Sequence, residues 1–397
     1  MKHGQIFFLI LGIDALILLL NTSQLSISYH EAYMLYGDFS FLQAITKSSL
    51  YLFGQNDFAL RLPMIVLHIL SLLLLYKISK KYLKHKRDRL WLISIFVLLP
   101  GVTSSAMLID SAGFVIFGLL LFIYLYENIA KKYIYILLLC YMVADGGFAY
   151  LFFALIFFSI YIKDRYFTVF NIVAFSISMT FYGLNTEGLP EGYFLDAIGL
   201  YAAIFTPIIF IYIFYTLYRR YLTKEIDVLW FVSSVTLVLS LLLSFRQRVE
   251  IEHFAPYLII ALPLAAQTFS SSYRVRLKCF RGKYRAVFII SLIFLLLNSL
   301  LVLFNKNIYL FLDEPQKHFA YKMHVAKELA QELKNRGINC VSTRKQMQKR
   351  LKFYAVSKCD DYILLQNGIS KNKEENVTIS YKNRPIYSAS VTKINTK

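Results

Sequence analysis

Long runs of apolar residues follow one another along most of this chain, with short polar stretches between them. A run of roughly 17 to 25 apolar residues is long enough to cross the hydrocarbon core of a membrane as a helix. The chain holds about eleven such runs, so the sequence predicts a polytopic α-helical membrane protein. The cores of the runs lie at 5–20, 62–79, 90–108, 111–126, 133–145, 147–162, 166–183, 198–217, 227–245, 254–270 and 286–304.

Two places in this pattern allow more than one interpretation. Only Asp145-Gly146-Gly147 interrupts the apolar sequence between 133 and 162, where two spans or one long bent span would fit. The alternation of charged loops favours two. The first run, which contains Asp14, has a short basic start like a signal peptide, but no small-x-small cleavage site follows it. We expect an uncleaved helix in which Asp14 faces the bundle interior beside a polar partner.

The pattern changes after residue 305, where charged residues appear every few positions. Helical spacing of apolar residues predicts helices at 313–337 and 344–355. Short apolar stretches predict strands at 338–343 and 361–366, and 376–393 has the pattern of a hairpin. We expect a membrane domain at 1–304, whose first outer loop spans 21–61, and a small C-terminal α/β extracytoplasmic domain at 305–397.

Composition agrees with a membrane protein. The chain is 57% hydrophobic and only 17% charged, and its mean hydropathy is +0.53. Soluble domains are close to half apolar, and about a quarter of their residues are charged. A soluble globular protein is therefore excluded.

The positions of Lys and Arg predict the orientation, because cytoplasmic loops retain positive charge. Every second loop is basic if the N-terminus is cytoplasmic, and these loops lie at 77–89, 131–132, 163–165, 218–224 and 273–285. The first loop and the C-terminal domain then lie outside the cytoplasm, as expected for a multi-pass protein of a bacterial inner membrane with a periplasmic C-terminal domain. The net charge of +19 fits contact with anionic membrane lipids. No nucleic-acid motif is present, and we expect no nucleic-acid partner.

Two of the four cysteines, Cys340 and Cys359, fall together in the predicted outer domain. In an oxidising periplasm they either remain free or form a disulfide, which would contribute about 3 kcal/mol on the chain-entropy account. No cysteine spacing typical of a metal site is present.

Few ionisable residues lie on the predicted outer side. The first loop contains His30, Glu31, Asp38, Asp57 and Arg61, the turn before the fourth span contains Asp110, and the loop before the tenth span contains Arg246, Arg248, Glu250, Glu252 and His253. A carboxylate can take a proton from an acceptor hydroxyl, and cations can stabilise a departing phosphate. These acids, arginines and histidines together suit the transfer of a chemical group from a phosphate donor.

Several segments together resemble the polyprenyl-phosphate-dependent glycosyltransferases of the C-type fold, such as bacterial relatives of protein O-mannosyltransferase and lipid A aminoarabinose transferase. The resemblance covers most of residues 1–305, and the outer domain agrees only in its placement. The segments are "HEAYMLYGDF", "LFGQNDFALRLP", "LLPGVTSSAMLIDSAGFVIFGLLLF" and "EHFAPYLIIALPLAA".

The resemblance implies roles for individual residues. Glu31 matches the second acid of the family's Asp-Glu pair, and His30 stands where the family has its first acid. "LYGDFSFLQ" keeps Asp38 but lacks the family's two prolines, and Asp145-Gly146-Gly147 stands where relatives often have Lys-Gly-Pro. The other matches are Arg61 in "FALRLP", Asp110 as the family's later acid, and His253 with Pro256 as its late outer-loop motif.

The implied activity is transfer of a sugar from a polyprenyl-phosphate donor to a lipid, glycan or protein acceptor, with inversion. Glu31 or Asp38 would act as base, neutral His30 could replace the missing acid, and Asp110 would be a further catalytic acid. Binding of the donor phosphate would fall to Arg61, Arg246, Arg248 and His253, because guanidinium groups bind phosphate by paired hydrogen bonds. No nucleotide-binding glycine pattern is present, and we expect no cofactor and no metal.

Structural roles are the alternatives for the same residues. Asp38, Asp57 and Asp110 are candidates for helix caps. Other possibilities are a solvated charge for Glu31, a snorkelling side chain for Arg61 and a hydrogen-bonded interface residue for His253. At the level of function, the alternatives are a transporter or flippase of a lipid-linked sugar and an inactive family member that binds glycolipid.

Overall fold

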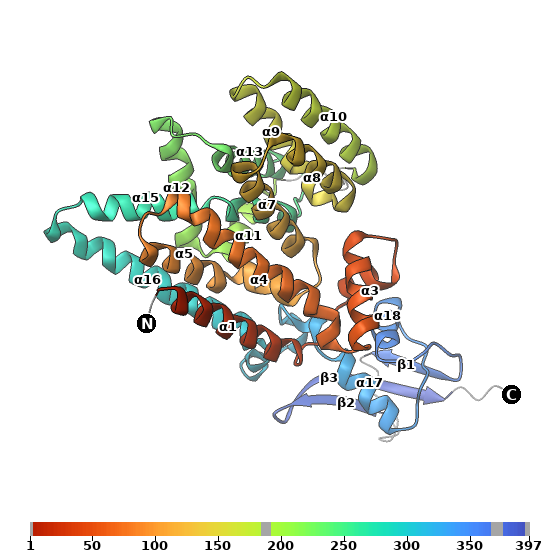
Figure 1. Cartoon of the computed structure of the whole chain (residues 1–397). Coiled ribbons are helices and arrows are strands. Elements are labelled where there is room, and N and C mark those ends of the chain that lie inside the picture. Colours follow the sequence, from red (N-terminus) through yellow and green to blue (C-terminus); the bar gives the residue numbers. More distant parts are fainter. Residues whose placement is uncertain (1–2, 184–191, 367–375, 394–397) are drawn as a thin grey trace. The chain divides into compact units, whose positions relative to one another are not determined.

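The computed structural model describes residues 3–183, 192–366 and 376–393, which are largely helical, with a small sheet near the C-terminus (Figure 1). The chain divides into two compact units. We call residues 1–18 and 64–299 the helix unit, and residues 19–63 and 300–397 the loop unit. The loop unit therefore combines the first predicted outer loop with the C-terminal segment.

Each of the eleven predicted runs coincides with one helix or with two consecutive helices. The break at Asp145 separates two helices, as the charge pattern favours. The elements are α1 (His3–Thr22), α4 (Asp57–Tyr82), α5 (Lys86–Leu98), α6 (Pro100–Met107), α7 (Ser111–Asn128), α8 (Lys131–Ala144), η1 (Gly146–Phe148), α9 (Ala149–Tyr161), α10 (Arg165–Tyr182), α11 (Phe194–Phe205), α12 (Pro207–Thr223), α13 (Val228–Ser244), α14 (Ile251–Ile259), α15 (Leu262–Val275) and α16 (Lys278–Leu303).

Three of the runs are bent helix pairs. The bends are 62° between α5 and α6, 106° between α11 and α12, and 44° between α14 and α15. In each pair a proline, Pro100, Pro207 or Pro263, lies in the first turn of the second helix, where its missing N–H and fixed φ are tolerated. Among the described residues, 4 helices are long and apolar enough to cross a membrane, or up to 7 if each bent pair is one span.

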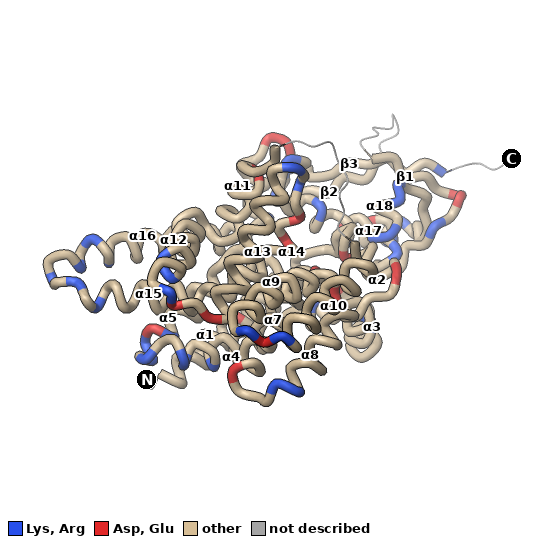
Figure 2. Tube along the Cα trace, turned by 90° about the horizontal axis from the view of Figure 1, so that it is seen from above, with Lys and Arg blue, Asp and Glu red and all other residues tan. Residues whose placement is uncertain are grey.

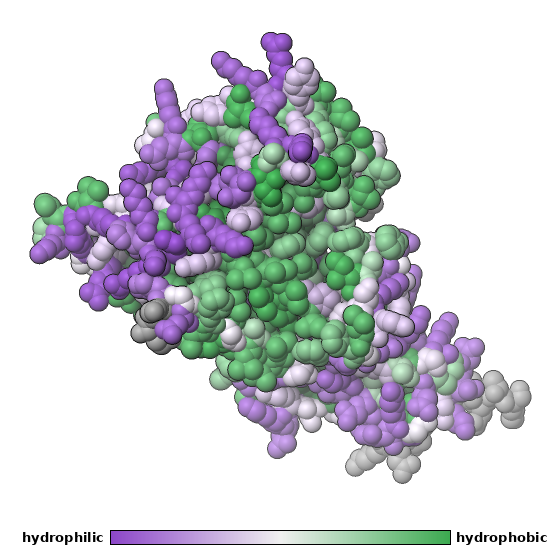
Figure 3. Space-filling view, viewed as in Figure 1, coloured by the Kyte–Doolittle hydropathy of each residue, from purple (hydrophilic) through white to green (hydrophobic). Residues whose placement is uncertain are grey.

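Aromatic packing between helices forms much of the core of the helix unit. Tyr141 stacks on Phe148 with ring centroids 4.2 Å apart, and its hydroxyl donates to the Gly118 carbonyl oxygen at 2.7 Å. A Cβ on Gly118 would overlap the Phe148 ring, so only glycine allows α7 to approach this pair. The unit also presents a broad apolar surface (Figure 3), with Leu16 57% exposed and Leu297 53% exposed. Such exposure is what lipid contact requires.

Asp14 has the polar partner that the sequence predicts. His68 Nε2 lies 2.8 Å from Asp14 Oδ2, and both side chains are buried. The pair joins α1 to α4 and accounts for an acid within the first apolar run.

The basic loops of the helix unit contact one another. Arg274 forms an ion pair with Asp88, Lys131 pairs with Asp164 at 2.9 Å, and Lys81 pairs with Glu127 at 2.9 Å. Figure 2 shows Lys and Arg residues along the connection between α15 and α16. The loops predicted to share the cytoplasmic side therefore include pairs that meet in space.

The loop unit contains two helices from the first loop and an α/β segment. Its strands form an antiparallel sheet in the order β1-β3-β2, in which Leu364 pairs with Val391 and Val377 with Ala389. The elements are α2 (Tyr29–Tyr36), α3 (Phe41–Phe53), η2 (Asn305–Leu310), η3 (Pro315–Lys317), η4 (Tyr321–Met323), α17 (Ala326–Asn335), α18 (Lys345–Phe353), β1 (Tyr362–Gln366), β2 (Asn376–Tyr381) and β3 (Arg384–Lys393).

Two expectations for this unit are wrong in part. The α-helix predicted at 313–337 forms only as α17, because the Ala320 N–H donates to His318 Nδ1 at 2.9 Å and not to a helical carbonyl oxygen. The other ring nitrogen of His318 lies 2.9 Å from the Asn305 carbonyl oxygen. The stretch at 338–343 makes only isolated parallel bridges, from Cys340 to Ser357 and from Ser342 to Ile363. The second helix, the strand at 361–366 and the hairpin form where predicted.

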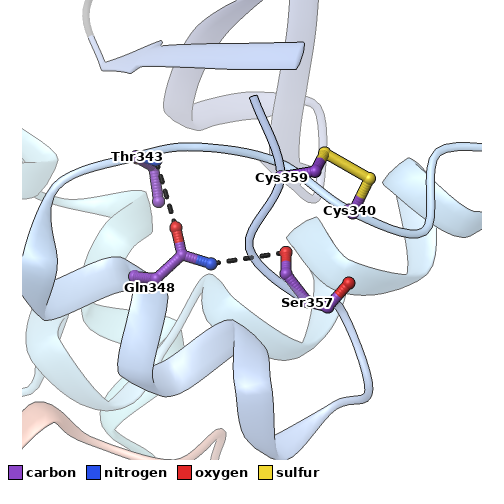
Figure 4. The surroundings of a disulfide bond; sticks show 5 residues. All are labelled: Cys340, Thr343, Gln348, Ser357 and Cys359. Atoms are coloured by element: carbon purple, nitrogen blue, oxygen red, sulfur yellow. Dashed lines mark hydrogen bonds between the residues drawn. A yellow bond between two sulfur atoms is a disulfide. The ribbon is translucent and has the colours of Figure 1, made fainter. Parts of the chain in front are cut away.

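A disulfide joins Cys340 to Cys359, whose Cα atoms lie 5.4 Å apart (Figure 4). The chain between them contains α18. Gln348 on that helix accepts from the Thr343 N–H at 3.2 Å and donates to the Ser357 carbonyl oxygen at 3.4 Å. The disulfide and these two hydrogen bonds thus link the residues that precede α18 to the residues that follow it.

Candidate functional site

In the loop unit, the carboxylate of Glu31 lies at the start of α2. Ser28 and Glu31 form a capping box, in which Ser28 Oγ accepts from the Glu31 N–H at 3.2 Å and Glu31 Oε2 accepts from the Ser28 N–H at 2.7 Å. The same Oε2 accepts from Arg61 Nη2 at 3.1 Å. We call Ser28, Glu31 and Arg61 the first-loop cluster.

The guanidinium of Arg61 holds the chain where α1 ends. It donates to the carbonyl oxygens of Leu25 and Ser26, both at 3.0 Å, and of Thr22 at 3.4 Å. Arg61 is 0% exposed and Glu31 is 1% exposed. Two alternative interpretations are therefore wrong: Glu31 is not a solvated loop charge, and Arg61 is not a snorkelling interface residue.

The remaining acids of the first loop do not cap its helices. Asp38 is exposed in the bend before α3, whose cap is Ser40. Asn56 Oδ1 accepts from the Ala59 N–H at 2.7 Å at the start of α4, whereas Asp57 forms an ion pair with Lys327 at 2.9 Å. The cap interpretation is wrong for both acids.

His30 is exposed on α2 and packs edge-on against Tyr29, with ring centroids 5.9 Å apart. Its exposure leaves the imidazole open to solvent.

In the helix unit, a second group of polar residues gathers where several helices begin or end. We call Asp110, Ser111, Asp145, Glu250 and His253 the helix-end cluster. Asp110 caps α7 and accepts from the Ser111 N–H at 2.7 Å, which confirms the interpretation of Asp110 as a cap.

His253 connects two members of this cluster. Its Nδ1 lies 3.4 Å from Ser111 Oγ, and its Nε2 lies 3.1 Å from Glu250 Oε2. A carboxylate, an imidazole and a hydroxyl thus follow one another in a chain. His253 is hydrogen-bonded, as the structural interpretation of this residue predicts. An imidazole held by a carboxylate can carry or exchange a proton.

Asp145 lies outside the helices, in the turn between α8 and η1. Its Oδ1 accepts from the Gly147 N–H at 2.7 Å. Burial raises the pKa of Asp145 above its usual value, the Gly147 hydrogen bond and nearby His253 oppose this, and the Asp110 charge adds to it. Such a carboxyl group exchanges a proton closer to neutral pH than an ordinary aspartate does.

Gly147, two residues after Asp145, must be a glycine in this geometry. A Cβ on Gly147 would lie 2.9 Å from Asp145 Oδ1, 2.7 Å from Val115 Cγ2 and 3.9 Å from His253 Nδ1. The Tyr257 hydroxyl donates to the Gly147 carbonyl oxygen at 2.5 Å. The backbone therefore passes close to both Asp145 and the imidazole.

Asp145 is a residue of the candidate site that the sequence did not predict: it enters the pattern as the break between two spans and as part of the segment that stands where relatives have Lys-Gly-Pro. The available signal is an acid followed by two glycines where an apolar sequence is interrupted.

Arg246 and Arg248 are exposed between α13 and α14. Within the described ranges, neither side chain has a hydrogen bond or ion pair. Two guanidinium groups close in sequence to His253 are thus available to an anionic ligand.

Among residues 3–183, 192–366 and 376–393, only Cys340, Cys359 and Asp361 bring three potential metal-ligand atoms close together. The two cysteines of that set are joined in the disulfide, so their sulfurs are not available as thiolates.

The helix unit and its bends define a polytopic membrane protein, and comparison with known proteins agrees. The chain is similar in fold to ArnT from Cupriavidus metallidurans in the apo state, with a TM-score of 0.53, 11% sequence identity and coverage of 97% of each chain. No family model and no curated protein matches the chain in sequence. The likeness is one of fold, and it confirms the predicted fold class of a polytopic α-helical membrane protein with a small C-terminal α/β domain.

Proposed function

We propose that this chain is an integral membrane glycosyltransferase that moves a sugar from a polyprenyl-phosphate donor to an extracytoplasmic lipid, glycan or protein. The observation that carries the proposal is the likeness in fold to ArnT over 97% of both chains. The order of the sequence motifs independently resembles the same enzyme class.

The position of the helix-end cluster supports chemistry on the outer side. Asp110 lies at the first end of α7, and Glu127, which pairs with basic Lys81, lies near the other end. The 18 residues of α7 span about 27 Å at 1.5 Å per residue. If the basic loops are cytoplasmic, the cluster belongs to the periplasmic side.

In the proposed reaction, a carboxylate takes the proton of an acceptor hydroxyl, and the oxygen attacks the anomeric carbon. The bond from that carbon to the phosphate oxygen breaks, and the electron pair leaves with the phosphate. Asp145 or Asp110 suits the role of base. For Asp145, the raised pKa favours proton uptake. A single displacement inverts the configuration.

Cations would hold the donor phosphate. Arg246 and Arg248 can each donate paired hydrogen bonds to it, and a ring N–H of His253, which lies 3.1 Å from Glu250, can donate one more. Glu31, Asp38 and His30 remain proposed bases of the first loop. The contacts of Arg61 with Glu31 and three carbonyl groups suit it to fixing that loop more than to binding phosphate.

The test compares cell-surface lipid, polysaccharide and protein by mass spectrometry with and without this chain. We expect one acceptor to lose its sugar when this chain is deleted from the cell. The sugar should return when the wild-type chain is restored, but not when the Asp145→Asn variant is. An unchanged sugar inventory contradicts the proposal. Donor lipid crossing sealed vesicles while no acceptor is modified would favour the transport alternative, and donor binding with neither event would favour an inactive binder.

A further inference from the structure

The segment that precedes Glu31 is bound by the C-terminal part of the loop unit. Arg350 on α18 donates from Nε to the Ile27 carbonyl oxygen at 2.8 Å and from Nη2 to Ser26 Oγ at 3.3 Å. It also donates to the His324 carbonyl oxygen at 2.6 Å and is buried. One guanidinium therefore joins α18, the turn before α17 and residues 26–27.

A second side chain following α18 binds both ends of the loop. The Tyr354 hydroxyl accepts from the Ile27 N–H at 2.9 Å and donates to Asp57 Oδ1 at 2.6 Å. Lys327 on α17 donates to the Ser23 carbonyl oxygen at 3.0 Å and pairs with Asp57 at 2.9 Å. The start and the end of the first loop are thus held by the same two C-terminal helices and the residue that follows α18.

Contacts of α18 with α2 continue this attachment. Lys349 Nζ lies 4.2 Å from the centre of the Tyr33 ring, and Lys352 Nζ lies 4.5 Å from the centre of the Tyr36 ring. These are cation–π contacts at helical spacing on both partners.

Residues 26–28 therefore have charged partners on two sides. Arg350 binds Ser26 and Ile27, Arg61 binds the Ser26 carbonyl oxygen, and Glu31 binds the Ser28 N–H. A shift of this segment would change the capping box and the Glu31–Arg61 pair together.

We propose that Arg350, assisted by Tyr354, is a positioning residue that holds residues 26–28 so that Glu31 and Arg61 keep the geometry needed for sugar transfer. The proposal rests on the proposed function for its effect on the reaction. Its structural part, the fixing of residues 22–31 by α18, is independent of any activity.

The test uses hydrogen–deuterium exchange of the full chain in detergent, together with transfer kinetics. Arg350→Met should speed exchange in 22–31 about tenfold or more, because buried charge-assisted bonds to the backbone are lost. Exchange in α7 should not change. The kcat for transfer should fall about tenfold, while the KM for the donor changes less than about threefold.

Three further variants sharpen the test. Arg350→Lys should recover part of both effects, and Lys345→Met, at an exposed position on the same helix, should produce neither. If Arg350→Met does not fold, Tyr354→Phe removes only the hydroxyl and should still speed exchange in 22–31 several-fold.

Unchanged exchange in 22–31 for both Arg350→Met and Tyr354→Phe overturns the proposal. So does faster exchange with a wild-type kcat. If wild-type protein transfers no sugar, the proposed function fails separately, and exchange alone decides whether α18 fixes the loop.

Discussion

The Glu31 carboxylate accepts a hydrogen bond from the Arg61 guanidinium at 3.1 Å, and both side chains are buried. Arg61 lies at the end of the first loop and Glu31 near its beginning, at the start of α2, so their pairing joins the two parts of that loop. A buried pair of this kind is costly to break from one side only, because the remaining charge loses its partner.

Glu31→Gln is expected to abolish transfer and to lower the free energy of unfolding by about 3–5 kcal/mol, since it removes the charge that pairs with Arg61. Thermal unfolding in detergent and a transfer assay measure the two effects. Combining Glu31→Gln with Arg61→Met should restore neither stability nor activity, because the carbonyl oxygens of Thr22, Leu25 and Ser26 then lose their buried donor. Wild-type transfer in either variant would remove Glu31 from the chemistry.

Asp110→Asn should abolish transfer and leave the fold intact. Asparagine caps helices about as well as aspartate, so the bond from the Ser111 N–H can persist while the carboxylate is lost. The melting temperature and the product yield separate the two roles. An active Asp110→Asn protein would leave Asp110 only its role as a cap.

Asp145 should control the acid side of the pH profile. The raised pKa of Asp145 means that a base at this position gains its proton, and transfer falls, at a higher pH than an ordinary aspartate would give. The same shift means that the folded state binds this proton more tightly than the unfolded state, so the stability gained is present at low pH and lost as pH rises through the folded pKa. Asp145→Asn should therefore lose transfer about a hundredfold or more without becoming less stable at neutral pH.

Arg246 and Arg248 are expected to act on donor binding. Because both are exposed, changing both to Gln should alter the free energy of unfolding by no more than about 0.5 kcal/mol. The KM for the polyprenyl-phosphate donor should rise about tenfold or more. Arg344→Gln, at an exposed position in the loop unit, serves as the control. An unchanged KM would assign the phosphate to other groups.

The disulfide should protect both of its cysteines from labelling. Without reductant, a maleimide reagent should leave Cys340 and Cys359 of the folded protein unmodified. Cys340→Ser should lower stability by about 3 kcal/mol on the chain-entropy account and speed exchange in α18. Cys279→Ser, at an exposed free cysteine, should do neither. Labelling of both residues in the untreated protein would show that the bond is not formed.

Much of the helix unit could be predicted because hydrophobic length and the positions of Lys and Arg are local properties of the sequence. Prolines such as Pro207 bend a run without changing its hydropathy, so the 106° bend between α11 and α12 leaves little sign in the pattern. In the C-terminal segment, His318 binds the Ala320 N–H in place of a helical carbonyl oxygen, which helical spacing alone does not reveal.

The candidate site was predicted less completely. Glu31, Arg61, Asp110 and His253 stood out because ionisable residues are rare beside apolar runs. That Glu31 pairs with Arg61 depends on how the first loop folds back, and that Asp145 approaches His253 depends on the close packing at Gly147. Neither relation can be derived from residue spacing.

The attachment of the first loop to α18 has a consequence for biosynthesis. The Ile27 carbonyl oxygen is bound by Arg350, 323 positions later in the chain. A ribosome must therefore synthesise the chain past Arg350, and the membrane must receive every intervening helix, before the loop forms its permanent contacts. Until then the nascent loop has only its internal contacts, such as the Ser28–Glu31 capping box and the hydrogen bonds of Arg61, and a chain cut short before α18 would leave it exposed to quality-control proteases.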